Sequence, residues 1–430
     1  MSETKKILPE LRFPKFKDSG EWDVKKISDL GETISGLTGK SKDDFGAGKP
    51  FVTYKQVFDN SVINFEQCER VQIKDDENQN SLQQGDILFT TSSETPNEVG
   101  FASVLIDFPK EKTYLNSFCF ALRPFNIEKT QPQFSRYLFH SPIYRRSVTA
   151  IAQGSTRYNL SKGAFIEIQV PIPDPTEQQK IASCLSSLDE VIEAHSKKLE
   201  LLKDHKKGLM QNLFPQEGEK VPKLRFKEFE NSGEWEEKKL GEVSKFVRGP
   251  FGGALKKEIF VSSGFAVYEQ SHAIYSNFKE FRYYINEDKF KELKRFAVNA
   301  GNLIMSCSGT MGKFAIIPKN FTEGVINQAL LKLEIKKEFM VDFIKLTLEL
   351  PENQEQILSQ SGGGAIKNVA SVNILKEIKI KIPSFAEQQK IASCLSSLDE
   401  LIAAQEEKIE QLKLHKKGLM QGLFPKTITN

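Results

Sequence analysis

One loop of the sequence combines side chains that commonly read the edges of base pairs. The stretch QGSTRYNLSKG (153–163) contains Arg157, Tyr158 and Asn159 shortly after a glycine. A guanidinium can donate two hydrogen bonds to guanine, and tyrosine and asparagine add further donors and acceptors. Gly154 has no Cβ atom and would let the backbone approach a nucleic acid closely. The loop is therefore a candidate DNA contact, and the alternative is a glycine-rich turn with a solvated charge.

A second stretch repeats this arrangement of a basic residue after glycine. In GGGAIKNVASV (362–372), Lys367 stands opposite Arg157 at a fixed offset of 210 residues, and Asn368 follows it. Because one arrangement occurs in two places, we interpret both loops as candidate contacts.

Other loops offer hydroxyl groups and lysines. The hydroxyls of TTSSETPNE (90–98) can donate to phosphates or base edges, with an ordinary turn as the alternative. Lysines in GLTGKSKDD (36–44) and RGPFGGALKK (248–257) can contact phosphates, which adds affinity but little specificity, and a solvated surface is the alternative. Two arginines of YRRS (144–147) are expected on a helix surface. The hydroxyl and lysine candidates are Thr91, Ser92, Ser93, Thr95, Lys40, Lys42, Lys256 and Lys257.

No catalytic machinery is visible in the sequence. There is no FxGxG motif with a downstream NPPF or DPPY, and no GxxxxGK[ST] phosphate loop. The five histidines have no metal-ligand spacing. A nuclease-like carboxylate and lysine set forms only by joining PD (173–174) to EIK (377–379). We therefore predict a binding protein with no catalytic residue, no metal site and no cofactor of its own.

The composition indicates several folded domains in a soluble, cytoplasmic protein. The 430 residues are 39% apolar, which is ample for buried cores. Lys and Arg number 60 against 57 acidic residues, so any basic surface is local. The five cysteines lack CxxC spacing, which is typical of reduced thiols. No signal peptide or membrane-spanning run is apparent.

Two copies of one unit must position these loops. EQQKIASCLSSLDE (177–190) recurs unchanged at 387–400. Upstream, LRFPKFKDSGEW (11–22) resembles LRFKEFENSGEW (224–235), and each ends with one of the two tryptophans. The chain is therefore a unit of about 210 residues used twice.

The middles of the two copies, about 33–170 and 246–380, differ almost throughout. Each ends in an alternating segment typical of a half-buried strand, IEIQVPIP (166–173) or EIKIKIP (377–383). Each middle is predicted to be one α/β domain, with a shared fold and a different surface.

Each repeated segment predicts a long helix. From Ile181 and again from Ile391, apolar residues recur at spacings of four and three over more than four heptads, which is typical of a coiled coil. A helix over 177–213 would be ~55 Å long at ~1.5 Å per residue. His195 and Gln405 occupy equivalent seam positions and would face each other in a fully overlapped antiparallel pair. A polar residue tolerated at a solvated seam is the alternative.

Duplication favours a two-fold relation, in which the helices run antiparallel with one domain at each end. Such a spacer suits a bipartite DNA target, because half-sites ~34–36 Å apart lie on the same face of a duplex. The expected parts are the first domain with its N-terminal segment (1–175), the central helix (176–216), the second domain (217–385) and the C-terminal helix and tail (386–430).

Apolar side chains crowd both helix ends beyond what a two-stranded seam needs. This excess predicts a docking patch for a partner, and local capping by a neighbouring domain is the alternative. The residues are Leu209, Met210, Leu213, Phe214, Leu419, Met420, Leu423 and Phe424.

The whole chain resembles the specificity subunits of Type I restriction-modification systems. The resemblance depends on GEW near the start of each copy, and on EQQKIA and KKGLMQ.LF after each middle. GDIL (85–88) also matches, although Asn302 replaces the aspartate in the second copy. The family implies two α/β target recognition domains, one per half-site, separated by two conserved helices in an antiparallel coiled coil.

The resemblance also implies partners. They are double-stranded DNA, two modification methyltransferase subunits, and restriction subunits with translocase activity in the full complex. S-adenosylmethionine, ATP and Mg²⁺ would then belong to those partner subunits. Two other readings stay open, a stand-alone DNA-acting enzyme such as a nuclease with an unrecognised site, and a coiled-coil scaffold with no nucleic-acid role. Steep salt dependence of duplex binding would exclude the scaffold.

Overall fold

The computed structural model describes residues 7–359 and 371–427. The chain divides into two compact units, unit 1 (Met1–Lys197 with Glu407–Asn430) and unit 2 (Lys198–Glu406). Two long helices, α6 (Pro175–Asn212) and α13 (Phe385–Leu423), are each divided between the units. Both helices predicted from the heptad pattern are therefore present, and each begins two residues before its EQQ motif.

Unit 1 contains a four-stranded antiparallel sheet and a three-stranded sheet. The first has the order β2-β9-β5-β7, formed by Gly31–Ser35, Cys119–Pro124, Ile87–Thr90 and Ala102–Val104. The second has the order β4-β3-β8, formed by Glu69–Val71, Phe45–Val52 and Tyr114–Leu115.

Two further strand pairs join distant parts of unit 1. They are β1 (Asp23–Lys26) with β11 (Gln169–Ile172), and β6 (Ser92–Ser93) with β10 (Tyr158–Asn159). The domain helices are α1 (Ile27–Leu30), α2 (Tyr54–Asp59), α3 (Pro132–Leu138), α4 (Pro142–Ala150) and α5 (Lys162–Ile166).

Unit 2 repeats this plan. Its four-stranded sheet has the order β13-β19-β16-β17, formed by Ser244–Arg248, Leu330–Ile335, Leu303–Ser306 and Phe314–Ile316. A three-stranded sheet has the order β15-β14-β18, formed by Tyr284–Ile285, Phe265–Tyr268 and Gly324–Ile326. β12 (Glu236–Lys239) pairs with β20 (Lys379–Ile382).

The helices of the second domain complete unit 2. They are α7 (Leu240–Val243), α8 (Gln270–Tyr275), α9 (Glu287–Glu292), α10 (Val341–Glu349), α11 (Pro351–Ser359) and α12 (Val372–Glu377). The four-stranded sheets of the two units share one strand order: in each, the strand that comes first in the chain pairs with the last, which pairs with the second, which pairs with the third. The predictions of mixed α and β content and of a shared fold are therefore confirmed.

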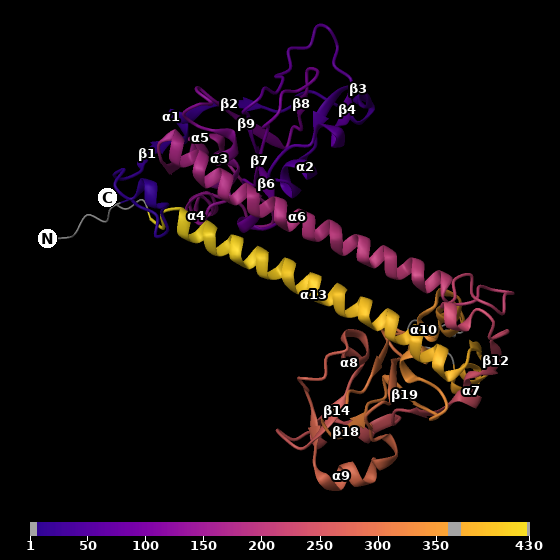
Figure 1. Ribbon diagram of the computed structural model, residues 1–430. Helices are drawn as coiled ribbons and strands as arrows, with labels where there is room; N and C mark the ends of the chain where they lie inside the picture. The colour runs from indigo at the N-terminus through magenta and orange to yellow at the C-terminus, as the bar shows by residue number, and fades with distance from the viewer. Residues whose placement is uncertain (1–6, 360–370, 428–430) are drawn as a thin grey trace. The chain divides into compact units, whose positions relative to one another are not determined.

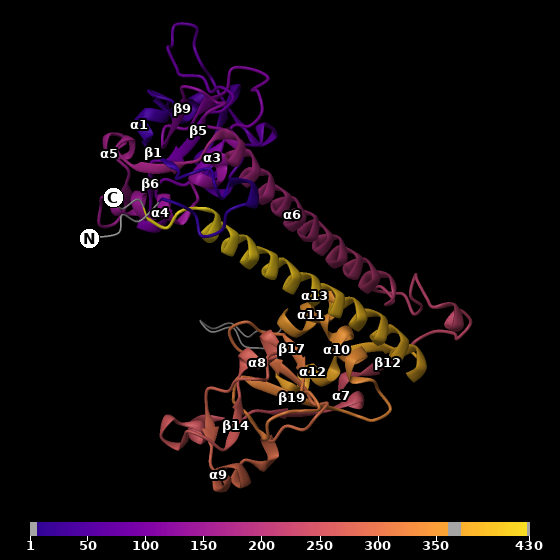
Figure 2. The same cartoon turned by 60° about the vertical axis from the view of Figure 1, so that its left-hand side comes forward.

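The main core of each unit joins its domain to the start of one long helix. In unit 1, Phe134 of α3 belongs to the same buried cluster as Ile181 and Leu185 of α6, and Figure 1 shows α3 beside the start of α6. In unit 2, Phe343 of α10 shares a cluster with Ile391 of α13, and Figure 2 shows α10 against α13. Burial of apolar side chains, worth about 1.5–3 kcal/mol each, therefore fixes each helix start to its own domain.

The aspartate of GDIL has a structural role. Asp86 is fully buried and accepts hydrogen bonds from the Nε and Nη2 atoms of Arg123 at 2.9 and 2.7 Å. It also accepts the backbone N–H of Gln83 at 2.8 Å. These bonds satisfy a carboxylate that would otherwise be costly to bury, and they explain why an acidic residue precedes β5.

Within the described residues, no helix is long and apolar enough to span a lipid bilayer. In the same part of the chain, no group of three or more His, Cys, Asp or Glu side chains is arranged to hold a metal ion.

Candidate nucleic-acid interface

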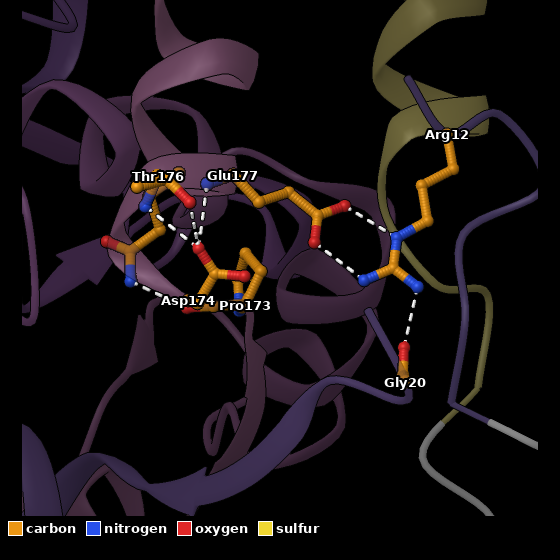
Figure 3. Close-up of polar contacts among 7 residues, drawn as sticks. Arg12, Gly20, Pro173, Asp174, Thr176 and Glu177 are labelled. Carbon is orange, nitrogen blue, oxygen red and sulfur yellow. Dashed lines mark hydrogen bonds and ion pairs between the residues drawn. The ribbon is translucent and has the colours of Figure 1, made fainter. Parts of the chain in front are cut away.

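An ion pair attaches the start of α6 to the N-terminal segment of unit 1. Arg12 donates from Nε and Nη2 to the two carboxylate oxygens of Glu177, at 2.8 and 2.7 Å, and from Nη1 to the carbonyl of Gly20 at 2.6 Å (Figure 3). Only 9% of the Arg12 side chain and 1% of the Glu177 side chain are exposed. The hydrogen bonds from Arg12 to Glu177 raise the pKa of the guanidinium. We call this contact the first junction ion pair.

Asp174 caps the same helix. Its Oδ1 atom accepts the backbone N–H groups of Thr176 and Glu177 at 2.9 and 3.1 Å, and the Thr176 hydroxyl also donates to it (Figure 3). These bonds satisfy two of the four amide groups that a helix leaves unpaired at its start. The cap and the first junction ion pair together fix the direction in which α6 leaves the domain.

The second copy makes the same contact with the same geometry. Arg225 donates to Glu387 from Nε and Nη2 at 2.8 and 2.7 Å, and to the carbonyl of Gly233 at 2.7 Å. We call this contact the second junction ion pair, and its side chains are 7% and 1% exposed.

The first glutamine of each EQQ motif bonds the long helix to the start of a neighbouring helix. Gln178 accepts the backbone N–H of Gln131 at 3.1 Å and donates to the carbonyls of Lys129 and Pro173 at 2.8 and 2.9 Å. In unit 2, Gln388 accepts the N–H of Met340 at 2.9 Å. Gln131 and Met340 are the N-cap residues of α3 and α10, so the repeated glutamine ties each long helix to its neighbour.

The predicted docking patch is corrected by burial. Phe424 is 1% exposed and packs in unit 1 against Phe134 and Trp22, with ring centroids 5.6 and 6.1 Å away. Phe214 is 2% exposed and packs in unit 2 against Phe343 and Trp235, at 5.4 and 5.9 Å.

The other predicted docking residues belong to the same two cores. Leu423 and Leu213 are buried in the unit 1 and unit 2 clusters, respectively. The partly buried residues packed against those clusters are Leu419, Met420, Leu209 and Met210. The alternative of local capping therefore describes the four buried residues, because side chains inside a core offer no surface to a partner, whereas the docking role of the four partly buried residues stays a prediction.

Ion pairs join the long helices within each unit. In unit 2, Lys203 and Lys206 of α6 contact Glu406 and Asp399 of α13 at 2.9 and 2.5 Å. As the numbering rises on α6 it falls on α13, so these segments run antiparallel. In unit 1, Lys416 contacts Asp189 at 2.5 Å.

The seam positions predicted to fix the register are partly or fully buried. Gln405 is 7% exposed and His195 is half-buried, and both take part in interactions. They belong to different units, and their mutual contact stays a prediction.

The structure brings together the two loops that the sequence singled out in the first domain. Ser93 pairs with Tyr158 and Ser92 with Asn159 across β6 and β10, and the N–H of Leu160 donates to the carbonyl of Thr91 at 2.8 Å. Residues 91–101 and 153–160 therefore form one continuous surface.

Arg157 and Asn159 are exposed on this surface, and Tyr158 is half-buried. The charge of Arg157 also acts on the hydroxyl of Tyr54 in α2. Burial raises the pKa of Tyr54 and the positive charge of Arg157 opposes that shift. The exposed guanidinium is thus available to a ligand.

The local backbone requires a glycine at position 154. Its φ angle is +137°, and a Cβ atom there would lie 2.0 Å from the carbonyl oxygen of Arg157. The close approach expected from this glycine therefore occurs within the turn that joins Gln153 to Asn159, against the backbone of Arg157.

The hydroxyl candidates divide into two groups. Thr91 and Ser93 donate to the carbonyl of Phe118 and to Glu98, at 2.7 and 2.8 Å, and Ser92 is buried. Ser92 and Ser93 are buried and shape the loop, in place of the DNA contact that was predicted for them, whereas the contact predicted for the partly exposed Thr91 stays a prediction. Thr95 is exposed at the loop tip, where the predicted contact stands.

The lysine candidates also differ. Lys40 is 5% exposed and paired with Glu77 at 2.5 Å, which neutralises its charge and removes the basis for its predicted phosphate contact. Lys42, Lys256 and Lys257 are exposed. Lys367 and Asn368 lie outside the described residues.

Sequence reasoning missed part of this surface. In unit 2, the loop after β16 exposes Thr310 and Lys313, at the place that 91–101 occupies in unit 1. The similarity of GDILFTTSS to GNLIMSCSG (301–309) locates this loop but ends before both residues. Phe118, 57% exposed beside Thr91, had no sequence signal.

Two copies of one α/β domain carrying different loops define an internally duplicated recognition protein. The family described as "Type I restriction modification DNA specificity domain" matches residues 19–204 and again 232–414. These matches cover most of the chain, which therefore belongs to this family and has its role in DNA sequence recognition.

Relatives support the same conclusion. The chain is 27% identical over 425 residues to the "Type I restriction enzyme MjaIX specificity subunit" of Methanocaldococcus jannaschii, which covers 95% of this chain and 93% of that protein. The fold of this chain is similar to that of a Type-I restriction-modification S subunit from M. genitalium. The TM-score is 0.56 and the identity 16%, with 98% of this chain and 100% of that chain covered.

A further structure, described as showing complex assembly and conformational transition of the type I R-M system, contains a chain with a TM-score of 0.58. It is 15% identical, with 94% of this chain and 98% of that chain covered. At these identities, the likeness to both solved structures concerns the fold.

Proposed function

We propose that each unit reads one half of a bipartite DNA target, and that the paired helices act as an antiparallel coiled-coil spacer between the half-sites. The observation that carries this proposal is one scaffold made twice with different loops. The junction ion pairs are the same in both units, whereas TSSET (91–95) in one corresponds to CSGTMGK (307–313) in the other. A repeated frame with diverged loops is what reading two different sequences requires.

The chain would have no catalysis of its own, and methylation would come from two modification methyltransferase subunits docked on it. S-adenosylmethionine, ATP and Mg²⁺ would be bound by those subunits and by restriction subunits in the full complex. Since Leu213, Phe214, Leu423 and Phe424 are buried, docking would use the exposed apolar residues of the long helices. These are Val191, Leu201, Phe385, Leu401 and Leu414.

Genome-wide mapping of adenine methylation tests the proposal. Cells would express this chain with its cognate methyltransferase subunit, beside cells that lack this chain. We expect a bipartite motif with a fixed gap only when the chain is present. Replacing residues 246–380 by those of a relative should change one half of the motif. An assembled complex that methylates no such motif would overturn the proposal.

Binding of the purified chain to duplex DNA separates this function from that of a scaffold. Phosphate contacts by exposed lysines and Arg157 predict affinity that falls steeply with salt. Binding that is absent, or insensitive to salt, would favour the scaffold. DNA cleavage by the chain alone would favour an enzyme.

A further inference from the structure

One helix in each unit uses its fourth residue to hydrogen-bond a loop of the candidate interface. α4 and α11 both begin with proline, at Pro142 and Pro351. Their fourth residues are Arg145 and Gln354, which have different chemistry. We call residues 91–101 the first contact loop and residues 307–313 the second contact loop.

Arg145 holds the first contact loop at three points. Its Nη2 atom donates to the carbonyl of Asn97 at 2.7 Å, and its Nη1 atom donates to the carbonyl of Gly100 at 3.1 Å. The guanidinium also lies over the ring of Phe101, 4.7 Å from its centroid. This side chain, expected from the sequence to lie on a helix surface, therefore spans the second half of the loop.

Gln354 holds the second contact loop at the equivalent place. Its Nε2 atom donates to the carbonyl of Gly312 at 3.0 Å and to the carbonyl of Leu348 at 2.8 Å. Thus a side-chain N–H from the fourth helical residue meets a glycine carbonyl in both units, although the residue types differ.

The two glycines share a conformation that other residues rarely adopt. Their φ angles are +66° at Gly100 and +70° at Gly312. A Cβ atom at Gly100 would lie 2.8 Å from Val148 of α4, and one at Gly312 would lie 2.9 Å from Gln354 of α11. Each loop is therefore in close contact with its helix, and the hydrogen-bonded carbonyl is the point of contact.

These loops carry the exposed side chains available for reading DNA. Thr95 is exposed in the first, and Thr310 and Lys313 are exposed in the second. Displacement of the held carbonyl would move those side chains relative to base edges, where discrimination depends on hydrogen-bond geometry.

We propose that Arg145 and Gln354 are positioning residues for DNA recognition, each fixing the contact loop that reads one half-site. The proposal rests on the proposed function and goes beyond it by assigning specificity to two side chains that would act through the loops they hold. The guanidinium holds two loop carbonyls and the amide holds one, so the two loops are constrained to different degrees.

The test measures discrimination by the assembled methyltransferase complex. The substrates are duplexes that carry the motif methylated by the wild-type complex, each with one base-pair change. Arg145→Met should lower the ratio of methylation rates on correct and altered duplexes about tenfold at one half-site. Gln354→Met should do so at the other half-site. Arg145→Gln, which has the amide of the second copy, should restore part of the ratio.

Arg146→Met is the matched control, because Arg146 is the next residue of α4 and donates to the carbonyl of Lys426, which lies outside the first contact loop. A purely structural role for Arg145 would lower all rates together and leave the ratios unchanged, and that result would overturn the proposal. A change at both half-sites from one substitution would also overturn it. If the wild-type complex methylates no bipartite motif, the proposed function itself fails, which is a distinguishable result.

Discussion

Removing one carboxylate at the start of α6 should selectively destabilise unit 1. The substitution is Glu177→Gln, which keeps the size of the side chain and removes the charge that Arg12 meets at 2.8 and 2.7 Å. Both side chains are less than 10% exposed. The guanidinium would therefore stay buried without its counter-charge.

The expected cost follows from this burial. Breaking a buried ion pair by removing one partner typically costs about 3–5 kcal/mol. Because glutamine retains one acceptor, we expect the lower end, about 3 kcal/mol. Replacing both residues by methionine should recover most of that loss, since a buried pair replaced by apolar groups is often close to neutral.

The two tryptophans allow each unit to be measured separately. Trp22 lies in the core of unit 1 and Trp235 in that of unit 2. Among the described residues, neither buried indole N–H has a hydrogen-bond partner, so replacing either by phenylalanine loses no such bond. In a Trp235→Phe background, fluorescence during urea unfolding reports unit 1 alone.

With a denaturant slope of ~3 kcal/mol per M, Glu177→Gln should lower the unfolding midpoint of unit 1 by about 1 M. Glu387→Gln in a Trp22→Phe background is the matched experiment for unit 2. A midpoint that moves by less than ~0.2 M would refute the reasoning. So would a double replacement that costs as much as the single one.

Two further predictions use the same reporters. Phe424→Ala should cost unit 1 about 3–5 kcal/mol through the cavity it leaves, and Phe214→Ala should cost unit 2 as much; a loss confined to the unit reported by the other tryptophan would contradict the packing. Burial lowers the pKa of His140 to about 4, with a backbone hydrogen bond opposing the shift. The unfolded chain therefore binds a proton more readily below pH ~6.5, and unit 1 should lose about 3 kcal/mol as pH falls from ~6.5 to ~4. In His140→Gln this loss should disappear from urea midpoints measured across that range, and an unchanged slope would exclude His140 as its source.

The sequence predicted the features that depend on local pattern. The heptads of α6 and α13 are periodic over their whole length, so the existence of both helices followed from spacing alone. The duplication was evident because fourteen residues recur unchanged at 177–190 and 387–400. The sequence indicated only in part why these fourteen residues are identical. An acid in a first helical turn suggests capping, whereas the partner of Glu177 is an arginine 165 residues away.

Features that depend on pairing between distant segments could not be predicted. β6 and β10 contain two residues each, too few for a strand pattern, and their pairing joins residues 65 and 67 positions apart. The sequence correctly indicated that the helix ends have more apolar residues than the seam of a two-stranded coiled coil needs. However, a pattern of hydrophobic residues does not specify which domain Phe214 or Phe424 fills, and docking was predicted where burial occurs. The phosphate contact predicted for Lys40 was likewise wrong, because the sequence pattern does not show that Glu77 of another loop pairs with this lysine.

The division of the chain between the units has a consequence for folding during synthesis. Unit 2 is a continuous segment, Lys198–Glu406, whereas unit 1 needs residues from both ends of the chain. Trp22 emerges from the ribosome early, yet Phe424, against which it packs at 6.1 Å, emerges about 400 residues later. At ~5–20 residues per second, the nascent first domain would expose this apolar site for roughly 20–80 s. The domain made first is thus completed last.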